Sequence, residues 1–128
     1  MKKIFLLIAF VFAGLSLQAQ AKIEFKSETI DYGNIAKGSD GVRIFEFTNT
    51  GDADLIISNV KSSCGCTVPE KPKGPIAPGA SGEIKVKYDT KRVGPIRKTV
   101  TVYSNATQAI KALKIKGVVN ANKSILEN

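Results

Sequence analysis

The fold of this chain is decided most clearly by the stretch Gly82-Glu83-Ile84-Lys85-Val86-Lys87-Tyr88-Asp89. Ile84, Val86 and Tyr88 occupy alternate positions, and charged residues fill the positions between and around them. Successive side chains of a β-strand point to opposite faces of its sheet, so this pattern gives one apolar face and one charged face. The stretch is therefore predicted to be a half-buried β-strand.

The same period of two recurs along the chain beyond its first twenty residues, and no window shows a sustained helical stripe. Phe45 and Phe47 are predicted to point into the core, and Leu113 and Ile115 share an apolar face with Gly117. Further strands are expected at residues 23–25, 29–32, 42–49, 55–60, 99–103 and 110–119. Because two half-buried sheets must cover one another, we expect an all-β fold, an immunoglobulin-like β-sandwich of about seven strands.

One segment breaks the alternation with turn-forming residues. Between residues 71 and 82 the chain carries three prolines and three glycines. A proline has no backbone N–H to donate to a sheet ladder, so these residues do not suit a central strand. The segment is predicted to be a crossover loop.

The N-terminus has the organisation of a secretory signal peptide. Two lysines are followed by an apolar run from Ile4 to Leu15, and small residues follow at Ala19 and Ala21. The run is shorter than the roughly 20 residues that span a bilayer. We therefore expect a signal peptide over residues 1–21, cleaved after Ala19 or Ala21, and a periplasmic or secreted protein. The mature chain would have no transmembrane segment, one domain over residues 22–119 and a polar tail over residues 120–128.

The chain has a formal net charge of +8, and loss of Lys2 and Lys3 with the signal peptide leaves +6. All of this excess lies after residue 70, because residues 22–70 hold five basic and eight acidic residues, and a basic cluster is expected around a turn at Gly94-Pro95. The candidate basic face consists of Lys85, Lys87, Lys91, Arg92, Arg97, Lys98, Lys114 and Lys116. The favoured interpretation is a solvated, solubilising surface, and the alternative is attraction to an anionic glycan or lipopolysaccharide. Nucleic acid is not an expected partner, because the chain is exported and shows no aromatic stacking platform.

Chemistry in this chain is restricted by the absence of histidine and the presence of only two cysteines, Cys64 and Cys66. Without histidine there is no Ser-His-Asp or Cys-His catalytic arrangement and no imidazole metal site. We therefore expect no enzyme activity and no cofactor. Any redox or metal chemistry must use the Cys64-Gly65-Cys66 motif.

Four states of this motif remain open. A fully extended segment would leave two thiols too far apart to join, whereas a turn at Gly65 permits a strained disulfide ring. An oxidising compartment favours a structural disulfide. The alternatives are a redox-active bridge, a Cu(I) site made by two thiolates, and two cysteines that act as small core residues.

Several motifs in order resemble one bacterial family, the domain of unknown function 1573. They are Asp31-Tyr32-Gly33-Asn34-Ile35, Phe45-Glu46-Phe47-Thr48-Asn49-Thr50-Gly51, Ser63-Cys64-Gly65-Cys66-Thr67, Pro75-Ile76-Ala77-Pro78-Gly79 and Gly82-Glu83-Ile84. The resemblance extends from about Ile23 to Val119. It implies an Ig-like sandwich akin to the modules of Hydin and to the major sperm protein fold, in exported bacterial proteins, and it implies no activity.

Together these observations predict an exported, non-catalytic Ig-like module that pairs with an unidentified protein of the cell envelope. The alternative is a small thiol-disulfide or Cu(I)-handling protein that acts through Cys64 and Cys66.

Overall fold

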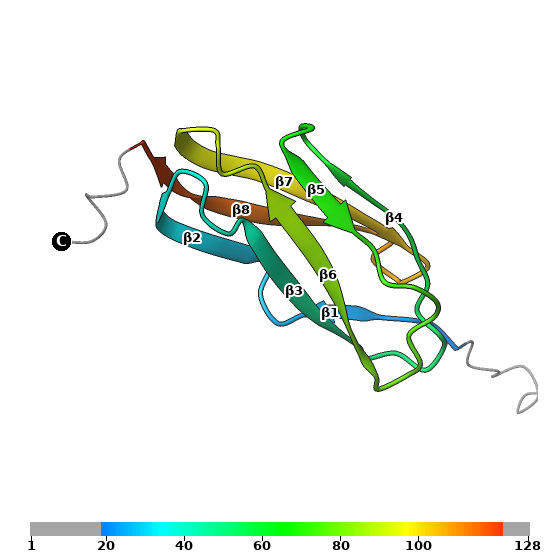
Figure 1. Ribbon diagram of the computed structural model, residues 1–128. Helices are drawn as coiled ribbons and strands as arrows, with labels where there is room; N and C mark the ends of the chain where they lie inside the picture. The colour runs from blue at the N-terminus through cyan, green and yellow to red at the C-terminus, as the bar shows by residue number, and fades with distance from the viewer. Residues whose placement is uncertain (1–18, 122–128) are drawn as a thin grey trace, which may run out of the picture.

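Residues 19–121 are described by the computed structural model, which is a sandwich of two four-stranded β-sheets (Figure 1). Sheet A has the strand order β1-β3-β6-β5, and sheet B has the order β2-β8-β7-β4. The strands are β1 (Ile23–Phe25), β2 (Thr29–Ala36), β3 (Val42–Asn49), β4 (Ile57–Ser62), β5 (Thr67–Glu70), β6 (Ser81–Tyr88), β7 (Gly94–Ser104) and β8 (Ile110–Asn120). The predicted all-β sandwich is confirmed, with eight strands.

The strand that sequence analysis missed is β5, a four-residue edge strand that contains Pro69. A second difference concerns β7, which begins at Gly94 and not near Thr99. The expected turn at Gly94-Pro95 is therefore the first part of a strand, and the turn lies just before it, at residues 90–92. Pro95 is tolerated there because β4, the neighbour of β7 on one side, pairs only with residues 100–104.

The proline- and glycine-rich segment does not cross between the sheets. It connects β5 to β6, which are neighbouring antiparallel strands of sheet A. Ile76, within this segment, forms an isolated bridge with Leu55. The prediction of a crossover loop was therefore wrong, because the crossing from sheet B to sheet A occurs earlier, between β4 and β5.

The two sheets enclose a single hydrophobic core. The side chains predicted to point inward are buried, namely Phe45, Phe47, Ile84, Val86, Tyr88, Leu113 and Ile115. Gly117 continues their face on β8 and has a φ of 144°. A Cβ at this position would lie 2.8 Å from the carbonyl oxygen of Gly33, so the absence of a side chain lets β2 approach β8 closely.

At one end of the sandwich, Tyr32 of β2 joins the two sheets. Its hydroxyl donates a hydrogen bond to the carbonyl oxygen of Gly41 at 2.7 Å, and its ring meets Tyr88 of β6 edge to face. The Arg43 guanidinium lies 4.2 Å from the centre of the Tyr32 ring. Burial raises the pKa of Tyr32 to about 12, and the positive charge of Arg43 opposes that shift.

The predicted signal peptide lies outside the described residues up to position 18, as does the predicted tail from position 122. The ordered domain includes Ala21, which is buried and whose carbonyl oxygen accepts a hydrogen bond from the Thr107 N–H. Of the two expected cleavage positions, the one after Ala19 would leave this contact intact. No helix within residues 19–121 has the length and apolarity needed to cross a bilayer.

Candidate functional site

The Cys64-Gly65-Cys66 motif forms the corner at which the chain passes from sheet B to sheet A. It follows β4, an edge strand of sheet B, and precedes β5, an edge strand of sheet A. The chain turns at Gly65, and Cys64 and Cys66 form a disulfide with their Cα atoms 5.4 Å apart. This separation lies within the range of ordinary disulfides. Of the states left open by the sequence, the structure therefore contains the disulfide.

Hydrogen bonds attach this disulfide corner to the strands on both sides. The Ser62 hydroxyl bonds to the carbonyl oxygen of Thr67 at 2.7 Å and also contacts the carbonyl oxygen of Cys64. The Asp89 N–H, just after β6, donates to the carbonyl oxygen of Cys66 at 2.8 Å. The corner is thus also held by hydrogen bonds to backbone carbonyl oxygens, none of which involves a sulfur atom.

The two cysteines differ in burial. Cys66 is buried, whereas Cys64 is half-buried and packs against the edge of the core. Gly65 and Cys66 line a hollow of about 570 Å³, together with Val68, Lys87 and the loops at residues 38–41 and 88–91. Cys64 is therefore the more exposed residue of the pair, whereas Cys66 is the one that lines this hollow.

Lys98, one of the predicted basic residues, belongs to the inner face of sheet B. Ser62 is the partner of Val100, and the Ser63 N–H donates to the Thr99 carbonyl oxygen at 3.0 Å. Lys98 precedes Thr99 on β7, and the paired part of β4 ends at Ser62. Lys98 is half-buried, and its partner on β8 is the fully buried Ile115, so its side chain starts from the inner face of sheet B.

The structure distributes the eight predicted basic residues over four places. Lys85 and Lys87 project from the outer face of sheet A, whereas Arg97, Lys114 and Lys116 project from the outer face of sheet B. Lys98 belongs to the inner face of sheet B, and Lys91 and Arg92 lie in the loop between β6 and β7. They do not form one continuous face, because β6 and β8 are strands of different sheets.

The outer face of sheet B contains residues that sequence analysis did not connect with the lysines. Lys61 of β4 lies 5.7 Å from the centre of the Tyr103 ring, and Thr101 of β7 is the register partner of Lys61. The alternation along β7 could have indicated that Thr101 and Tyr103 share a face with Arg97. Only the pairing of β4 with β7 places Lys61 beside them.

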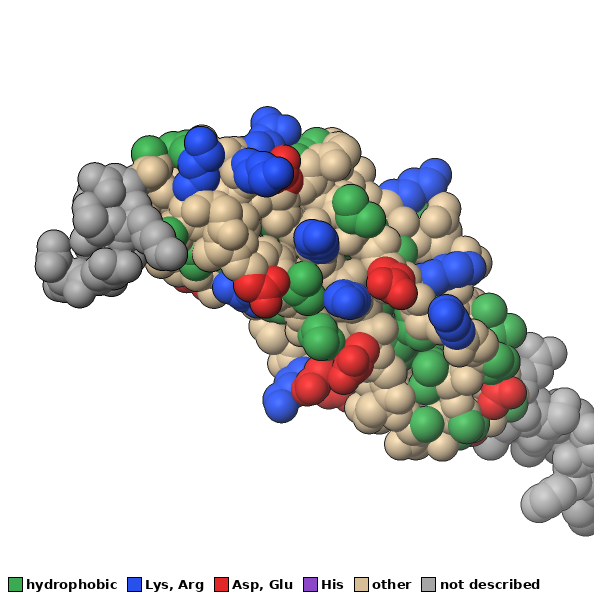
Figure 2. Space-filling view, in the orientation of Figure 1, with side chains coloured by type: hydrophobic (Ala, Val, Ile, Leu, Met, Phe, Trp, Pro, Cys, Tyr) green, Lys and Arg blue, Asp and Glu red, His purple; other side chains and the backbone are tan. Residues whose placement is uncertain are grey.

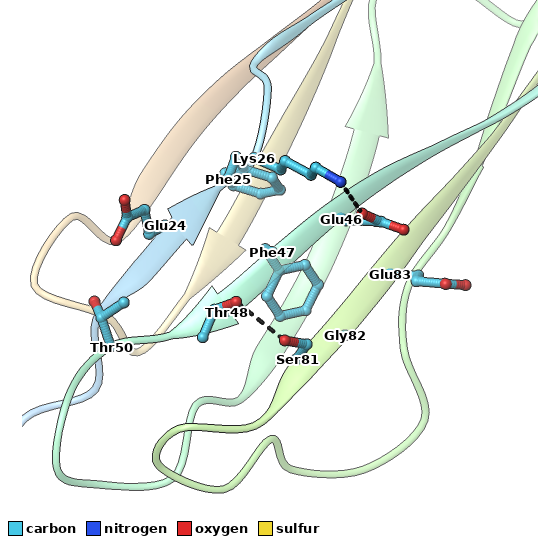
Figure 3. A pocket seen from close by; sticks show the side chains of 10 residues that line it. All are labelled: Glu24, Phe25, Lys26, Glu46, Phe47, Thr48, Thr50, Ser81, Gly82 and Glu83. Carbon is cyan, nitrogen blue, oxygen red and sulfur yellow. Dashed lines mark hydrogen bonds and ion pairs between the residues drawn. The ribbon is translucent and has the colours of Figure 1, made fainter.

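A second surface feature that sequence analysis missed is a shallow hollow of about 880 Å³ on sheet A (Figure 3). Three carboxylates line it, from Glu24, Glu46 and Glu83, and the Lys26 ammonium pairs with Glu46 at 3.4 Å. The Thr48 and Ser81 hydroxyls bond across its floor at 3.0 Å. Within residues 19–121, the geometry brings together no group of three or more His, Cys, Asp or Glu side chains suited to hold a metal ion.

Comparisons with solved structures show the fold. A protein of unknown function from Porphyromonas gingivalis W83 matches with 19% identity and a TM-score of 0.70 over 84% of this chain, which spans only 50% of that protein. PapD-like domain 7 of human CEP192 matches with 10% identity and a TM-score of 0.66, covering 85% of this chain and 92% of that one. WR4, a Caenorhabditis elegans member of the MSP family, matches with 14% identity and a TM-score of 0.54, covering 77% and 98%. The chain therefore has a PapD-like and MSP-like Ig fold.

Sequence comparison assigns the chain to a family. No curated protein matches it. The family model for "Protein of unknown function (DUF1573)" matches residues 23–119, which is nearly the whole described domain and agrees with the resemblance noted from the motifs. The chain belongs to the DUF1573 family.

Proposed function

We propose that this chain is an exported, non-catalytic Ig-like module that mediates protein-protein interaction in the bacterial cell envelope. The observation that carries the proposal is a patch of apolar and basic side chains on the outer face of sheet A. We call it the sheet A patch, and it consists of Val42, Ile44, Val68, Lys85 and Lys87.

The strand register assembles the sheet A patch from three adjacent strands. Val42 of β3 and Val68 of β5 are both partners of Lys87 on β6. Ile44 of β3 is the partner of Lys85. Partners in an antiparallel pair point to the same side of the sheet, so these side chains form two neighbouring rows.

The exposure of the patch is high for branched apolar residues. Ile44 is 45% exposed and Val68 is 62% exposed. Figure 2, in which β3, β5 and β6 face the viewer, shows apolar side chains lying between charged ones on this face. An apolar patch rimmed by charges is typical of protein interfaces, whose centres are apolar and whose rims are polar.

A photo-crosslinking amino acid at position 44, introduced into the exported protein in its producing bacterium, tests the proposal. We expect a covalent adduct with one or a few proteins, which is lost when Val68→Asp is added. The matched control carries the crosslinker at Thr99 on sheet B and should not give the same adduct. The Cys64→Ser, Cys66→Ser double variant should keep the adduct. Absence of any protein adduct from position 44 would contradict the proposal.

A second candidate function is thiol-disulfide exchange at the disulfide corner, and the greater exposure of Cys64 than of Cys66 supports it. A thiolate of an external dithiol would attack the Cys64 sulfur, form a mixed disulfide there and displace Cys66 as a thiolate, which then takes up a proton. The second thiol of the dithiol would resolve the mixed disulfide, leaving two cysteine thiols and an oxidised partner. The Cu(I) alternative needs the same reduced pair, because thiolates are the ligands that Cu(I) prefers.

The Cys66→Ser variant separates this candidate from the module. If exchange is the function, the remaining thiol at Cys64 should accumulate a mixed disulfide with a partner protein, visible by non-reducing electrophoresis, whereas Cys64→Ser should accumulate less. Cu(I) titration of the reduced wild-type protein tests the metal alternative in parallel. If the mature protein forms no mixed disulfide and takes up no Cu(I), the disulfide at this corner has a structural role alone.

A further inference from the structure

The outer face of sheet B differs from the sheet A patch in composition and points to a different partner. We propose that this face is a docking surface for an anionic lipid bilayer. This surface, here the sheet B face, is formed by Lys61, Arg97, Lys114 and Lys116 with the neighbouring side chains of Pro95, Tyr103, Ile110 and Val118. The proposal goes beyond protein capture and does not depend on it, since it uses the opposite side of the sandwich.

The cations of the sheet B face come together through the register of three strands. Lys116 of β8 is the partner of Arg97 on β7, and Lys114 is the partner of Thr99. Lys61 of β4 is the partner of Thr101, two positions further along β7. The same register sets one acidic residue on this face, Asp31 of β2, beside Lys116.

Arg97 and Lys116 are like charges directly opposite each other, an arrangement that destabilises an antiparallel pair. The ion pairs formed within residues 19–121 are Lys26 with Glu46 and Lys111 with Glu28, so neither neutralises this pair. Apart from Asp31 beside Lys116, the positive charge of the sheet B face therefore meets only solvent and any anion that approaches it. Electrostatic attraction to a surface of anionic headgroups is the interaction that such a face supports.

Apolar side chains at both ends of the face favour a lipid surface over a soluble polyanion. Along β8, the outward positions run from Ile110, which is 63% exposed, through the two lysines to Val118, which is 39% exposed. Tyr103 is the partner of Ile110, and Pro95 is the partner of Val118. A hydrated glycan offers little to an exposed isoleucine, whereas the headgroup region of a bilayer accommodates apolar and aromatic side chains beside cations.

Co-sedimentation of the mature protein with lipid vesicles tests the proposal directly. We expect binding to vesicles of phosphatidylglycerol mixed with phosphatidylcholine, no binding to pure phosphatidylcholine, and weakening as salt is raised. Each cation removed should weaken partitioning about fivefold, so Arg97→Gln with Lys116→Gln should lower it by roughly 25-fold. The Ile110→Ser variant should weaken binding at constant charge.

The matched control removes two cations from the other side of the sandwich. Lys85→Gln with Lys87→Gln makes the same change in net charge on sheet A and should bind vesicles nearly as well as the wild type. Equal losses in the two double variants would overturn the proposal, since binding would then follow net charge and not a particular face. Binding to a soluble sulfated glycan without binding to the anionic vesicles would also overturn it. Thermal unfolding of each variant confirms that a loss of binding does not arise from unfolding.

Discussion

The outer faces of the two sheets come from the same alternating pattern, yet they carry their lysines in different surroundings. On sheet A, Lys85 is the partner of Glu70 on one side, and Glu46 and Glu83 face each other one row away. On sheet B, Lys116 faces Arg97 on one side and Asp31 on the other. The difference teaches that the number of lysines does not define a binding surface, because strand pairing decides which charges lie beside each lysine. Two cations are paired directly on sheet B, whereas the like charges paired directly on sheet A are carboxylates. The two faces should therefore differ in salt dependence and in the kind of partner they bind.

The largest expected effect comes from removing part of the core that supports both faces. Phe45 is 1% exposed and fills the space between the sheets. Phe45→Ala should lower the free energy of unfolding by about 3–5 kcal/mol, through lost burial and the cavity left behind. Urea denaturation followed by circular dichroism measures it, with Ile44→Ala on the outer face of the same strand as the control. A loss below 1 kcal/mol would show that the faces do not depend on this shared core.

A smaller loss of stability is expected from changing Asn49 at the end of β3, and it should concern sheet A more than sheet B. The buried side chain of Asn49 donates to the carbonyl oxygens of Ala53 at 2.8 Å and of Ile76 at 2.9 Å, and it accepts the Gly51 N–H at 3.0 Å. Asn49→Ala removes these three hydrogen bonds from half-buried backbone groups, of which the Ile76 carbonyl oxygen keeps its bond from the Leu55 N–H, so we expect a loss of about 2–3 kcal/mol. Hydrogen exchange should show added opening in β3 and in the residue 71–80 loop, with β7 and β8 protected as before. An equal loss of protection in the strands of both sheets would contradict the prediction that Asn49 supports sheet A more than sheet B.

How much of the fold and of the candidate site could be predicted from the sequence depends on how far apart along the chain the interacting residues lie. Alternation is local, and it correctly placed Phe47, Val86 and Leu113 in the core. It missed β5, because a four-residue edge strand with a proline has too short a pattern and is held by its pairing with β6. Chain order could not assign β6 and β8 to different sheets, so the basic residues could not be sorted into faces.

The disulfide corner shows the same limit. The sequence showed that a turn at Gly65 would permit a Cys64–Cys66 bridge, and it left the other states open. It could not show that the turn connects the edges of two sheets, or that Lys98 would lie on the inner face of sheet B. Both facts follow from the pairing of β4 and β8 with β7 and of β5 with β6.

The buried phenol of Tyr32, which joins the two sheets at one end of the sandwich, should make the stability of the fold depend on pH. Burial raises the pKa of Tyr32 in the folded state to about 12, above its ordinary value of 10.0. The folded protein therefore holds the phenol proton more tightly than the unfolded chain. The resulting stabilisation is fully present below pH 10 and is lost as the pH rises towards 12, by on the order of 2 kcal/mol.

Urea midpoints between pH 9 and pH 11.5 measure this loss, and the Tyr32→Phe variant is the control because its ring cannot ionise. The decline in the variant should be shallower than in the wild type. Parallel declines would mean that Tyr32 titrates with an ordinary pKa and that the end of the sandwich is more open than the structure indicates.

The smallest expected effect distinguishes the two faces most directly, because it concerns the same kind of substitution on each. Arg97→Glu places a carboxylate opposite Lys116 and replaces repulsion by attraction, so it should raise the free energy of unfolding by about 0.2–1 kcal/mol at low salt. Lys85→Glu does the reverse on sheet A, since it sets a carboxylate opposite Glu70, and it should lower stability by a similar amount. Both changes should shrink when salt screens the charges. Thermal unfolding at low and high salt measures the pair, and changes of the same sign would contradict the registers from which the two faces were defined. If Arg97→Glu raises stability and also weakens binding to anionic vesicles, the wild-type face keeps a repulsive pair at a cost to the stability of the fold. That is the behaviour expected of a surface that binds an anion.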